Sequence, residues 1–351
     1  MALFAIPDIH IAGISAAVPQ NREHTIDYSW ISRKERESVI KNIGVETRRV
    51  AEKGVTTSDL CFIAAEKLLT ELKWDRKEVE LLVFVSQSRD YLVPTTACIL
   101  QDRLGLSHSC LAFDVGLGCS GYIYGLSIIG GMMQQGIIRK ALLMVGDIST
   151  LTTAYRDKST YPLFGDAGTV TALEYQPGAP KMIFNLQTDG SGYKALIIPD
   201  GGARNRMSRK SFEFKRYDKG IYRSRLNLEL NGIEVFNFTL REVVPNIKTL
   251  LNHSGHQIQS FDYLVLHQAN RLINETLRKM LKVEPEKVPY SIRDYGNTSG
   301  ASVPLTMVTQ IREQMIYGKL NLLLSAFGVG LSWGSVILET NSIVCPELIE
   351  V

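Results

Sequence analysis

Gly136-Ile-Ile-Arg-Lys-Ala-Leu-Leu-Met-Val-Gly146 is one of two similar stretches that indicate how this chain folds. Its counterpart, Gly318-Lys-Leu-Asn-Leu-Leu-Leu-Ser-Ala-Phe-Gly328, begins 182 residues later (318 − 136) and has the same apolar run between two glycines. Two further pairs keep the same order at similar offsets: Cys119-Ser-Gly121 with Thr298-Ser-Gly300, and residues 81–86 with residues 263–267. Three matching pairs in one order indicate that a single unit has been duplicated. We therefore predict two halves, residues 1–178 and residues 179–351.

The repeated unit has an α/β pattern. Short runs rich in Val, Ile and Leu alternate with amphipathic helical stretches, which is typical of strands buried between helices. The clearest strand-like runs lie at residues 81–86, 141–146, 263–266 and 321–326. In such a unit the loops that follow the strands gather at one edge of the sheet, where ligands tend to bind. Strand ends from both halves can then contribute to one site.

The composition is that of an ordinary globular protein and excludes several classes of function. With 45% hydrophobic and 21% charged residues, the chain is unsuited to disorder. Its formal net charge of +3 is too small to favour nucleic acid as a partner. The cysteines show no CxxC spacing, so we expect neither a zinc site nor disulfides. They are Cys61, Cys98, Cys110, Cys119 and Cys345.

We expect the protein to be cytoplasmic. Residues 1–13 lack the basic start and the long apolar core of a signal peptide. No apolar run approaches the roughly 18 residues that a membrane span needs. The odd number of cysteines also fits a reducing compartment.

One cysteine stands where a reactive thiol would be expected. Cys119 lies in the run Phe113-Asp-Val-Gly-Leu-Gly-Cys-Ser-Gly-Tyr122, between a predicted strand and a predicted helix. The free N–H groups and the positive dipole end of a helix N-terminus stabilise a thiolate, so we expect a pKa below the usual value of about 8.5. The small neighbours would let a substrate carbonyl approach the sulfur. The alternative is an inert buried thiol, since free cysteine often packs as a small hydrophobe.

Two residues of the second half have the position and the chemistry to act with this thiol. His267 follows the strand-like run 263–266 and precedes a predicted helix at 270–281. Asn297 lies in the loop Asp294-Tyr-Gly-Asn-Thr-Ser-Gly300. Each alone has a simpler interpretation, the histidine as a structural hydrogen-bonding residue and the asparagine as a turn residue. Together with Cys119 they form a set that acyl-transfer chemistry can use.

The motifs around these residues resemble those of 3-oxoacyl-[acyl-carrier-protein] synthase III, a family of the thiolase superfamily. They occur in order along nearly the whole chain: Asn42-Ile-Gly-Val-Glu-Thr-Arg-Arg49, Gly118-Cys-Ser-Gly121, Phe164-Gly-Asp-Ala-Gly168, His267-Gln-Ala-Asn270, Gly296-Asn-Thr-Ser299 and Ala326-Phe-Gly-Val-Gly-Leu-Ser-Trp-Gly334. The resemblance implies a thiolase-like α/β fold, in which duplicated halves form a five-layered αβαβα core. It also implies a homodimer.

The resemblance further implies a condensing acyltransferase that initiates fatty acid synthesis. Cys119 would take an acyl group from acyl-CoA or from acyl-ACP, with the backbone N–H groups of Cys119 and Val329 as the oxyanion hole. His267 and Asn297 would then stabilise the enolate that forms when malonyl-ACP loses CO2, and attack on the acyl-enzyme would give 3-oxoacyl-ACP. The implied partners are the acyl carrier protein and a coenzyme A thioester, with no metal and no other cofactor.

Several positions depart from the family pattern, and all of them concern substrate recognition. Val329 replaces the middle glycine of a Gly-Gly-Gly run and adds two methyl groups beside the site. Lys158 stands where an arginine usually assists adenine stacking. Arg271 lies one place before the family's carrier-binding arginine, where Leu272 stands. The tryptophan expected to stack on adenine has no clear counterpart, because the spacing after Trp30 is longer than in the family.

A basic segment at residues 204–225 is longer than the family's usual connection. Its nine basic residues stand against only Glu213 and Asp218. A solvated loop is one interpretation. The other is a docking surface for an acidic carrier protein or for CoA phosphates, whose local charge would speed association. The candidate docking residues are Arg204, Arg206, Arg209 and Lys210.

Two other functions stay open from the sequence. The same fold could transfer or condense acyl groups in specialised metabolism, which the changed CoA-recognition positions would allow. The chain could also be a catalytically silent partner subunit. The presence of Cys119, His267 and Asn297 together argues against a silent subunit.

Overall fold

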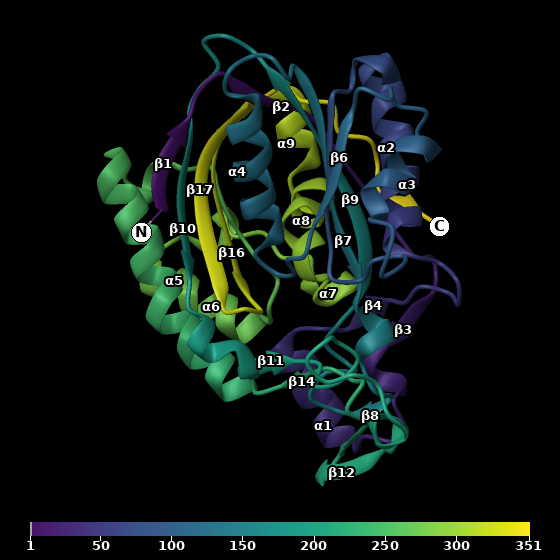
Figure 1. The fold of residues 1–351 in the computed structure, drawn as a ribbon. Coiled ribbons are helices and arrows are strands. Elements are labelled where there is room, and N and C mark those ends of the chain that lie inside the picture. The colour runs from purple at the N-terminus through teal and green to yellow at the C-terminus, as the bar shows by residue number, and fades with distance from the viewer. Residues whose placement is uncertain (1) are drawn as a thin grey trace.

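The computed structural model describes residues 2–351, and two β-sheets interleaved with three layers of helices form its core (Figure 1). The first sheet, in spatial order, consists of β18 (Ile349–Glu350), β2 (Ile9–Val18), β9 (Asp166–Tyr175), β7 (Lys140–Ile148), β5 (Leu81–Val85) and β6 (Leu111–Val115). The second consists of β1 (Ala2–Ile6), β10 (Met182–Thr188), β17 (Ser332–Asn341), β16 (Lys319–Gly328) and β15 (Tyr263–Leu266).

The two sheets share one pattern of strand pairing, as a duplication predicts. In the first, β5 and β7 run parallel, β7 and β9 antiparallel, and β9 and β2 antiparallel. In the second, β15 and β16 run parallel, β16 and β17 antiparallel, and β17 and β10 antiparallel. The four strand-like runs of the sequence overlap β5, β7, β15 and β16, so those strand predictions are confirmed.

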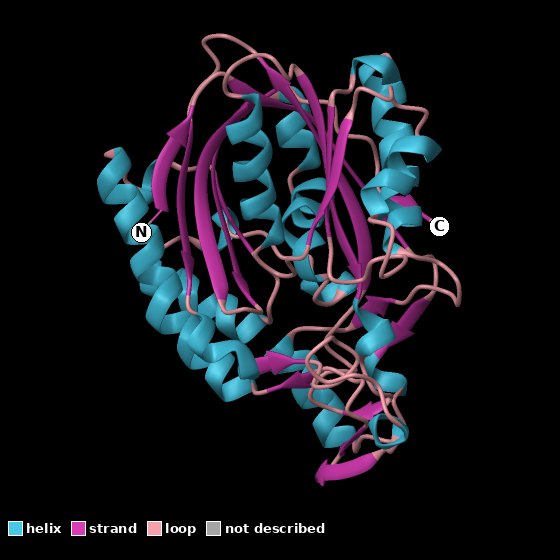
Figure 2. Ribbon diagram, viewed as in Figure 1, coloured by secondary structure: helices cyan, strands magenta, loops and turns pink. Residues whose placement is uncertain are grey.

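Helices cover both outer faces and fill the space between the sheets, which confirms the five-layered α/β core (Figure 2). One outer layer contains α5 (Gly232–Ser254) and α6 (Arg271–Leu281), and the other contains α2 (Thr57–Leu72) and α3 (Thr96–Arg103). The middle layer contains α4 (Gly121–Met133), α8 (Ser302–Gln310) and α9 (Arg312–Tyr317). The short α7 (Ile292–Tyr295) lies in the loop region before Asn297. None of the described helices is long and apolar enough to cross a membrane.

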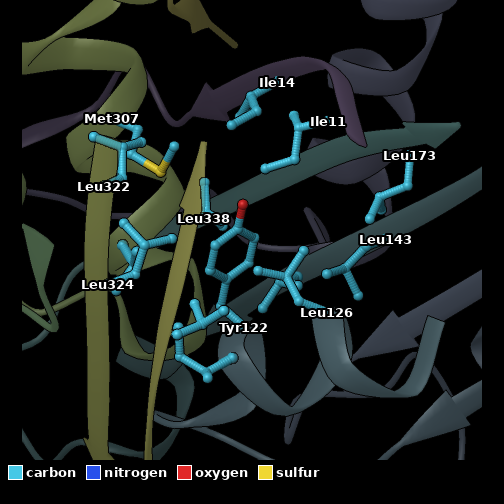
Figure 3. Close-up of a cluster of buried hydrophobic side chains, with 14 of the residues drawn as sticks. Ile11, Ile14, Tyr122, Leu126, Leu143, Leu173, Met307, Leu322, Leu324 and Leu338 are labelled. Carbon is cyan, nitrogen blue, oxygen red and sulfur yellow. The ribbon is translucent and has the colours of Figure 1, made fainter. Parts of the chain in front are cut away.

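The middle layer is held by apolar side chains from both sheets. Tyr122 and Leu126 of α4 lie between Leu143 of β7 and Leu324 of β16 (Figure 3). Burial of each large apolar side chain contributes about 1.5–3 kcal/mol. The Tyr122 hydroxyl is the polar exception, and it pairs with the Thr171 hydroxyl at 3.2 Å. The start of α4, where Cys119 lies, is therefore fixed by the packing of both halves.

A smaller lobe lies at one end of the sheets, below them in Figure 1, and we call it the cap lobe (residues 22–49, 149–163 and 190–231). Its elements are short: β3 (Arg22–His24), α1 (Arg33–Ser38), β4 (Thr47–Arg49), β8 (Arg156–Asp157), β11 (Leu196–Ile197), β12 (Lys215–Asp218), β13 (Ile221–Arg223) and β14 (Glu229–Leu230). The buried Arg48 connects this lobe to the core, because its guanidinium pairs with Glu23 at 2.6 Å and donates to the Phe164 carbonyl at 2.9 Å.

The two halves exchange their terminal strands. β1, from the start of the chain, pairs with β10, and β18, from its end, pairs with β2. The predicted boundary between residues 178 and 179 lies in the turn between β9 and β10 and stays a prediction.

Candidate active site

Cys119 lies where the two halves meet. It follows β6 and comes two residues before α4 begins, so it stands at a helix start as the sequence predicts. Its side chain is buried. Gly328, the last residue of β16, approaches so closely that a Cβ there would lie 2.7 Å from the Cys119 sulfur. Any side chain at position 328 would displace the sulfur, which explains the glycine.

The surroundings of the thiol raise its pKa, which contradicts the expected lowering. Burial is the largest cause and raises the pKa of Cys119 to about 11. The backbone N–H of Val329, the Ser299 side chain and the backbone N–H of Cys119 itself oppose this rise by hydrogen bonding to the sulfur. The expectation was wrong because the loss of water around the sulfur outweighs these donors. The backbone N–H groups of Cys119 and Val329, which are predicted to form the oxyanion hole, are therefore both close to the Cys119 sulfur.

His267 follows β15 and is almost fully buried, with 1% of its surface exposed. Its Nδ1 lies 2.7 Å from the Ser302 hydroxyl oxygen, which also accepts a hydrogen bond from the backbone N–H of Gln268 at 3.3 Å. In the tautomer in which this hydroxyl donates to Nδ1, the ring proton is on Nε2. Burial lowers the pKa of His267 to about 3, which leaves the ring neutral near pH 7. The site thus contains a neutral imidazole.

Asn297 is fixed by the backbone around it. Its N–H donates to the Leu163 carbonyl at 2.8 Å, and its own carbonyl accepts from the Gly165 N–H at 3.0 Å. Oδ1 accepts from the Ser299 N–H at 2.9 Å, which sets the orientation of the carboxamide. Nδ2 donates to the Ala269 carbonyl at 3.4 Å. One N–H of Nδ2 is left to donate to a ligand.

Two cavities meet at Cys119. The smaller, of about 50 Å³, is lined by Cys119, His267 and Asn297, so the structure brings the three predicted catalytic residues to one space. The larger, of about 370 Å³, is lined by Cys119, Val329 and several polar side chains of the β5 and β7 ends. The rest of its wall is mostly apolar, with Thr152 and Ser299 as the polar members: Ile148, Phe164, Leu196, Ile197, Ile198 and Leu228. Among residues 2–351, no group of three or more His, Cys, Asp or Glu side chains could hold a metal ion.

Lys158 lines neither of these cavities. Its ammonium group pairs with Glu35 at 2.9 Å. A separate cavity of about 330 Å³ in the cap lobe is lined by Trp30 together with Arg156 and Arg216. An aromatic ring beside planar guanidinium groups offers the stacking surfaces that suit a nucleotide base. The structure therefore places a tryptophan beside arginines, which the sequence spacing does not predict.

The other predicted binding residues lie away from the nucleophile. Arg271 begins α6 and, with Tyr290 and Arg293, lines a cavity of about 340 Å³ that does not include the catalytic candidates. The four basic candidates of the cap lobe lie between β11 and β12 and are all exposed. Within residues 2–351, no acidic side chain forms an ion pair with Arg204, Arg206, Arg209 or Lys210.

Two family models match the chain. The model described as 3-Oxoacyl-[acyl-carrier-protein (ACP)] synthase III matches residues 113–190, and its C-terminal counterpart matches residues 251–340. A beta-ketoacyl-[acyl-carrier-protein] synthase III of Syntrophomonas wolfei is 32% identical over 333 residues, which are 94% of this chain and 97% of the relative. The chain belongs to the 3-oxoacyl-[acyl-carrier-protein] synthase III family.

Solved structures agree with this assignment. A 3-oxoacyl-(acyl-carrier protein) synthase from Burkholderia xenovorans is 36% identical, with a TM-score of 0.92 over 99% of both chains. The 3-oxoacyl-(acyl carrier protein) synthase III of Pseudomonas aeruginosa is 26% identical, with a TM-score of 0.81 over 96% of this chain and 99% of that one. As a member of the synthase III family, the chain is a condensing acyltransferase, which confirms the predicted enzyme class.

Three residues at these sites are not predicted from the sequence: Trp30, Asp147 and Ser299. Trp30 is obscured because α1 and the π-helical turn at residues 39–43 lengthen the spacing to the next family motif. Asp147 lies near the end of β7, so the strand-end argument that identifies His267 could have identified it as well. Ser299 lies inside a recognised motif but gives no chemical signal of its own.

Proposed function

We propose that this chain initiates fatty acid synthesis by condensing an acyl thioester with malonyl-ACP. The observation that carries the proposal is the cavity lined by a buried cysteine, a neutral histidine and an asparagine carboxamide. A thiol can hold an acyl group, and two neutral N–H donors can stabilise an enolate. A decarboxylative condensation uses both capabilities in one site.

In the first half-reaction, the Cys119 thiolate attacks the carbonyl carbon of acyl-CoA or acyl-ACP. The carbonyl oxygen becomes negative and accepts hydrogen bonds from the backbone N–H groups of Cys119 and Val329, which lie at the sulfur. Loss of one such donor typically costs about 10²–10³ in rate. The tetrahedral intermediate then expels the donor thiol and leaves an acyl group on Cys119.

In the second half-reaction, the bond between the malonyl α-carbon and its carboxylate breaks and CO2 leaves. The electron pair forms an enolate, whose oxygen accepts hydrogen bonds from His267 Nε2 and Asn297 Nδ2. A neutral imidazole suits this role because it stabilises the enolate oxygen without readily protonating the carbon nucleophile. The enolate carbon attacks the acyl-cysteine, the Cys119 thiolate leaves, and 3-oxoacyl-ACP is the product.

The larger cavity suits the acyl chain of the donor. Its volume of about 370 Å³ and its apolar wall fit a chain of several carbons. Val329 narrows it beside the sulfur: its Cγ1 atom lies 2.9 Å from the position that a Cβ on Gly118 would take. The cavity beside Trp30 suits the adenine of a CoA donor. Donor selection therefore depends on both the main core and the cap lobe.

The basic segment suits the carrier protein as a docking surface. Arg204, Arg206, Arg209 and Lys210 are exposed and unpaired among the described residues, so their charge is available to an acidic partner. Phe212 and Phe214 beside them are also exposed, at 62% and 50% of their surface. A patch that combines cations with aromatic rings can provide both steering and contact area.

We also propose that the protein is a cytoplasmic homodimer. Strand β6 is an edge of the first sheet, and an unpaired edge favours pairing with another chain. The run Tyr91-Leu92-Val93 precedes α3, which packs against β6, and these three residues expose 62%, 80% and 83% of their surface. Exposed apolar residues next to an open edge support contact with a second copy of this chain.

The proposed first step is tested by intact-protein mass spectrometry. Wild-type protein mixed with a panel of acyl-CoA and acyl-ACP donors should gain the mass of one acyl group, and Cys119→Ala should gain none. Addition of malonyl-ACP should remove the acyl group and release CO2. Failure of every donor to acylate the wild-type protein would contradict the proposal and favour a silent subunit.

A further inference from the structure

His267 is held on three sides, which leaves one ring nitrogen for a substrate. Its backbone N–H donates to the Ser325 carbonyl at 2.8 Å, and its own carbonyl accepts from Asn274 Nδ2 at 3.0 Å. The Phe327 ring meets the imidazole edge to face, with 5.5 Å between the ring centres and an angle of 87°. Nδ1 lies against the Ser302 hydroxyl oxygen at 2.7 Å. Nε2 is therefore the nitrogen left for a ligand in the cavity of about 50 Å³ that His267 lines.

The use of Nε2 depends on which ring nitrogen carries the hydrogen. A neutral imidazole has one N–H group and one bare nitrogen, and only the N–H group can donate to an enolate oxygen. Burial keeps the imidazole neutral and outweighs the Ser299 backbone, which favours the protonated ring. For the role that the proposed function gives to His267, the hydrogen must be on Nε2, so this requirement rests on the proposed function. A neighbour of the ring has to select that tautomer.

Ser302 is the neighbour that can make the selection. The residue is fully buried, and its hydroxyl oxygen already accepts a hydrogen bond from the backbone N–H of Gln268 at 3.3 Å. Among residues 2–351, His267 Nδ1 is the only acceptor that this hydroxyl contacts. If Nδ1 carried the ring hydrogen, two donors would converge on the Ser302 oxygen and the hydroxyl hydrogen would be buried without an acceptor, which is costly. If Nδ1 is bare, the hydroxyl hydrogen has its acceptor.

We propose that Ser302 is a positioning residue that holds His267 in the tautomer with its hydrogen on Nε2. The hydroxyl donates to Nδ1 throughout the reaction, so no proton leaves either residue. The Nε2–H group is then already in place when charge develops on the enolate oxygen, and it stabilises that charge without rearrangement of the site. Ser302 lines neither cavity at Cys119, so it acts through the imidazole and not on the substrate.

The position of Ser302 in the fold keeps its hydroxyl on the ring. Ser302 is the first residue of α8, in the middle helical layer, and its carbonyl accepts from the Thr306 hydroxyl at 2.7 Å. Gln268, whose N–H donates to the Ser302 oxygen, is fixed in turn because its Nε2 donates to the Leu266 carbonyl at 2.8 Å. The end of β15 and the start of α8 therefore hold the hydroxyl and the imidazole in one arrangement.

Two variants separate this contact from the general effect of removing a buried hydroxyl. Ser302→Ala removes the hydroxyl beside Nδ1. Ser291→Ala is the matched control, since the Ser291 hydroxyl is also buried and bonds to the Thr306 hydroxyl of α8 at 2.7 Å, but does not contact the imidazole. In protein labelled with ¹⁵N-histidine, the shifts of the ring nitrogens and their couplings to the ring hydrogens distinguish Nε2–H from Nδ1–H. The signals of His267 are those that disappear in His267→Asn.

The wild-type spectrum should show the hydrogen of His267 on Nε2. Ser302→Ala should show both neutral tautomers, because the hydroxyl no longer selects one. With pre-acylated enzyme, this variant should lower kcat for CO2 release from malonyl-ACP on the order of tenfold, the effect expected for loss of one hydrogen bond. KM for malonyl-ACP and the rate of Cys119 acylation should keep their wild-type values, because the lost interaction acts on the developing enolate. Ser291→Ala should match the wild type in its spectrum and in its rates.

A wild-type spectrum with the hydrogen on Nδ1 would overturn the proposal, and this result does not depend on the folding of any variant. The same conclusion would follow from a folded Ser302→Ala with either the wild-type spectrum or the wild-type rate of CO2 release. It would also follow from an equal change in Ser291→Ala, or from a loss of acylation in Ser302→Ala as large as its loss of CO2 release. Absence of acylation in the wild-type protein would instead contradict the proposed function, while the spectrum would still report the tautomer.

Discussion

At the residue scale, one physical effect makes both the thiol and the imidazole neutral. Burial penalises the charged form of each group, so it raises the pKa of Cys119 to about 11 and lowers that of His267 to about 3. The resting site is therefore not a thiolate–imidazolium pair. His267 is available as a hydrogen-bond donor, which is what an enolate requires, and not as a cation.

The low pKa of His267 predicts how stability depends on pH. The unfolded chain binds a proton below its usual pKa of 6.5, while the folded chain does not until about pH 3, so stability is lost as the pH falls through this window. Between pH 6.5 and pH 5 the loss should be about 2 kcal/mol from this residue. Urea unfolding of the wild type and of His267→Asn at pH 7.5 and pH 5 measures it, because other titrating groups are common to both. Equal pH dependence in the two proteins would contradict the assignment.

At the element scale, the sequence predicts which strand ends meet at the site. It does not predict which residues of the cap lobe close the cavity over them. The runs at 263–266 and 321–326 become β15 and β16, and the residues that follow, His267 and Val329, reach the site as expected. The raised pKa of Cys119 could not be predicted, because the cavity around it is closed partly by Leu196 and Leu228 of the cap lobe. Those residues are distant in sequence and carry no motif, so only the folded chain places them there.

The loop between β16 and β17 should set the acyl preference. Val329→Gly removes the side chain that narrows the larger cavity beside Cys119. We expect the ratio of kcat/KM for isobutyryl-CoA to that for butyryl-CoA to rise about tenfold, the size of effect that a few methyl groups produce in a pocket. Val329→Ala should give an intermediate ratio. An unchanged ratio in both variants would show that this side chain does not contact the acyl group.

The segment before β12 should set the apparent affinity for the carrier. Reversal of three charges, Arg206→Glu, Arg209→Glu and Lys210→Glu, should raise KM for malonyl-ACP several-fold at low salt and by less at high salt, because salt screens exposed charges. The matched control reverses Lys181 and Lys248, which are also exposed but lie outside the cap lobe, before β10 and on α5. A KM that stays constant at low salt would exclude this segment as the dock.

At the scale of the whole molecule, duplication explains why the site lies at the centre. Each half supplies strand ends, and α4 packs between both sheets (Figure 1). Cys119 from the first half therefore meets His267 and Asn297 from the second at one cavity. The sequence repeat predicts this meeting. It does not predict the exchange of β1 and β18 between the sheets, because these short terminal strands have no counterpart in the repeat.

The exposed run Tyr91-Leu92-Val93 predicts the oligomeric state. If a second copy covers it, Leu92→Asp places a charge in the interface and should shift the protein from dimer to monomer in analytical ultracentrifugation. Ile137→Asp is the control, since Ile137 is also highly exposed, at 74%, but lies in the turn after α4. A dimer that survives Leu92→Asp, or a wild-type monomer, would contradict the predicted interface.

His267 and Asn297 are assigned to the second half-reaction and not to the first. The rate of CO2 release from malonyl-ACP tests this assignment most directly. With enzyme pre-acylated by its best donor, His267→Ala and Asn297→Ala should each slow CO2 release by about 10²–10³, as expected for loss of one enolate donor. Acylation of Cys119 in the same variants should stay within about threefold of the wild type. Wild-type CO2 release in either variant, or loss of acylation as large as the loss of CO2 release, would contradict the assignment of these two residues to the second half-reaction.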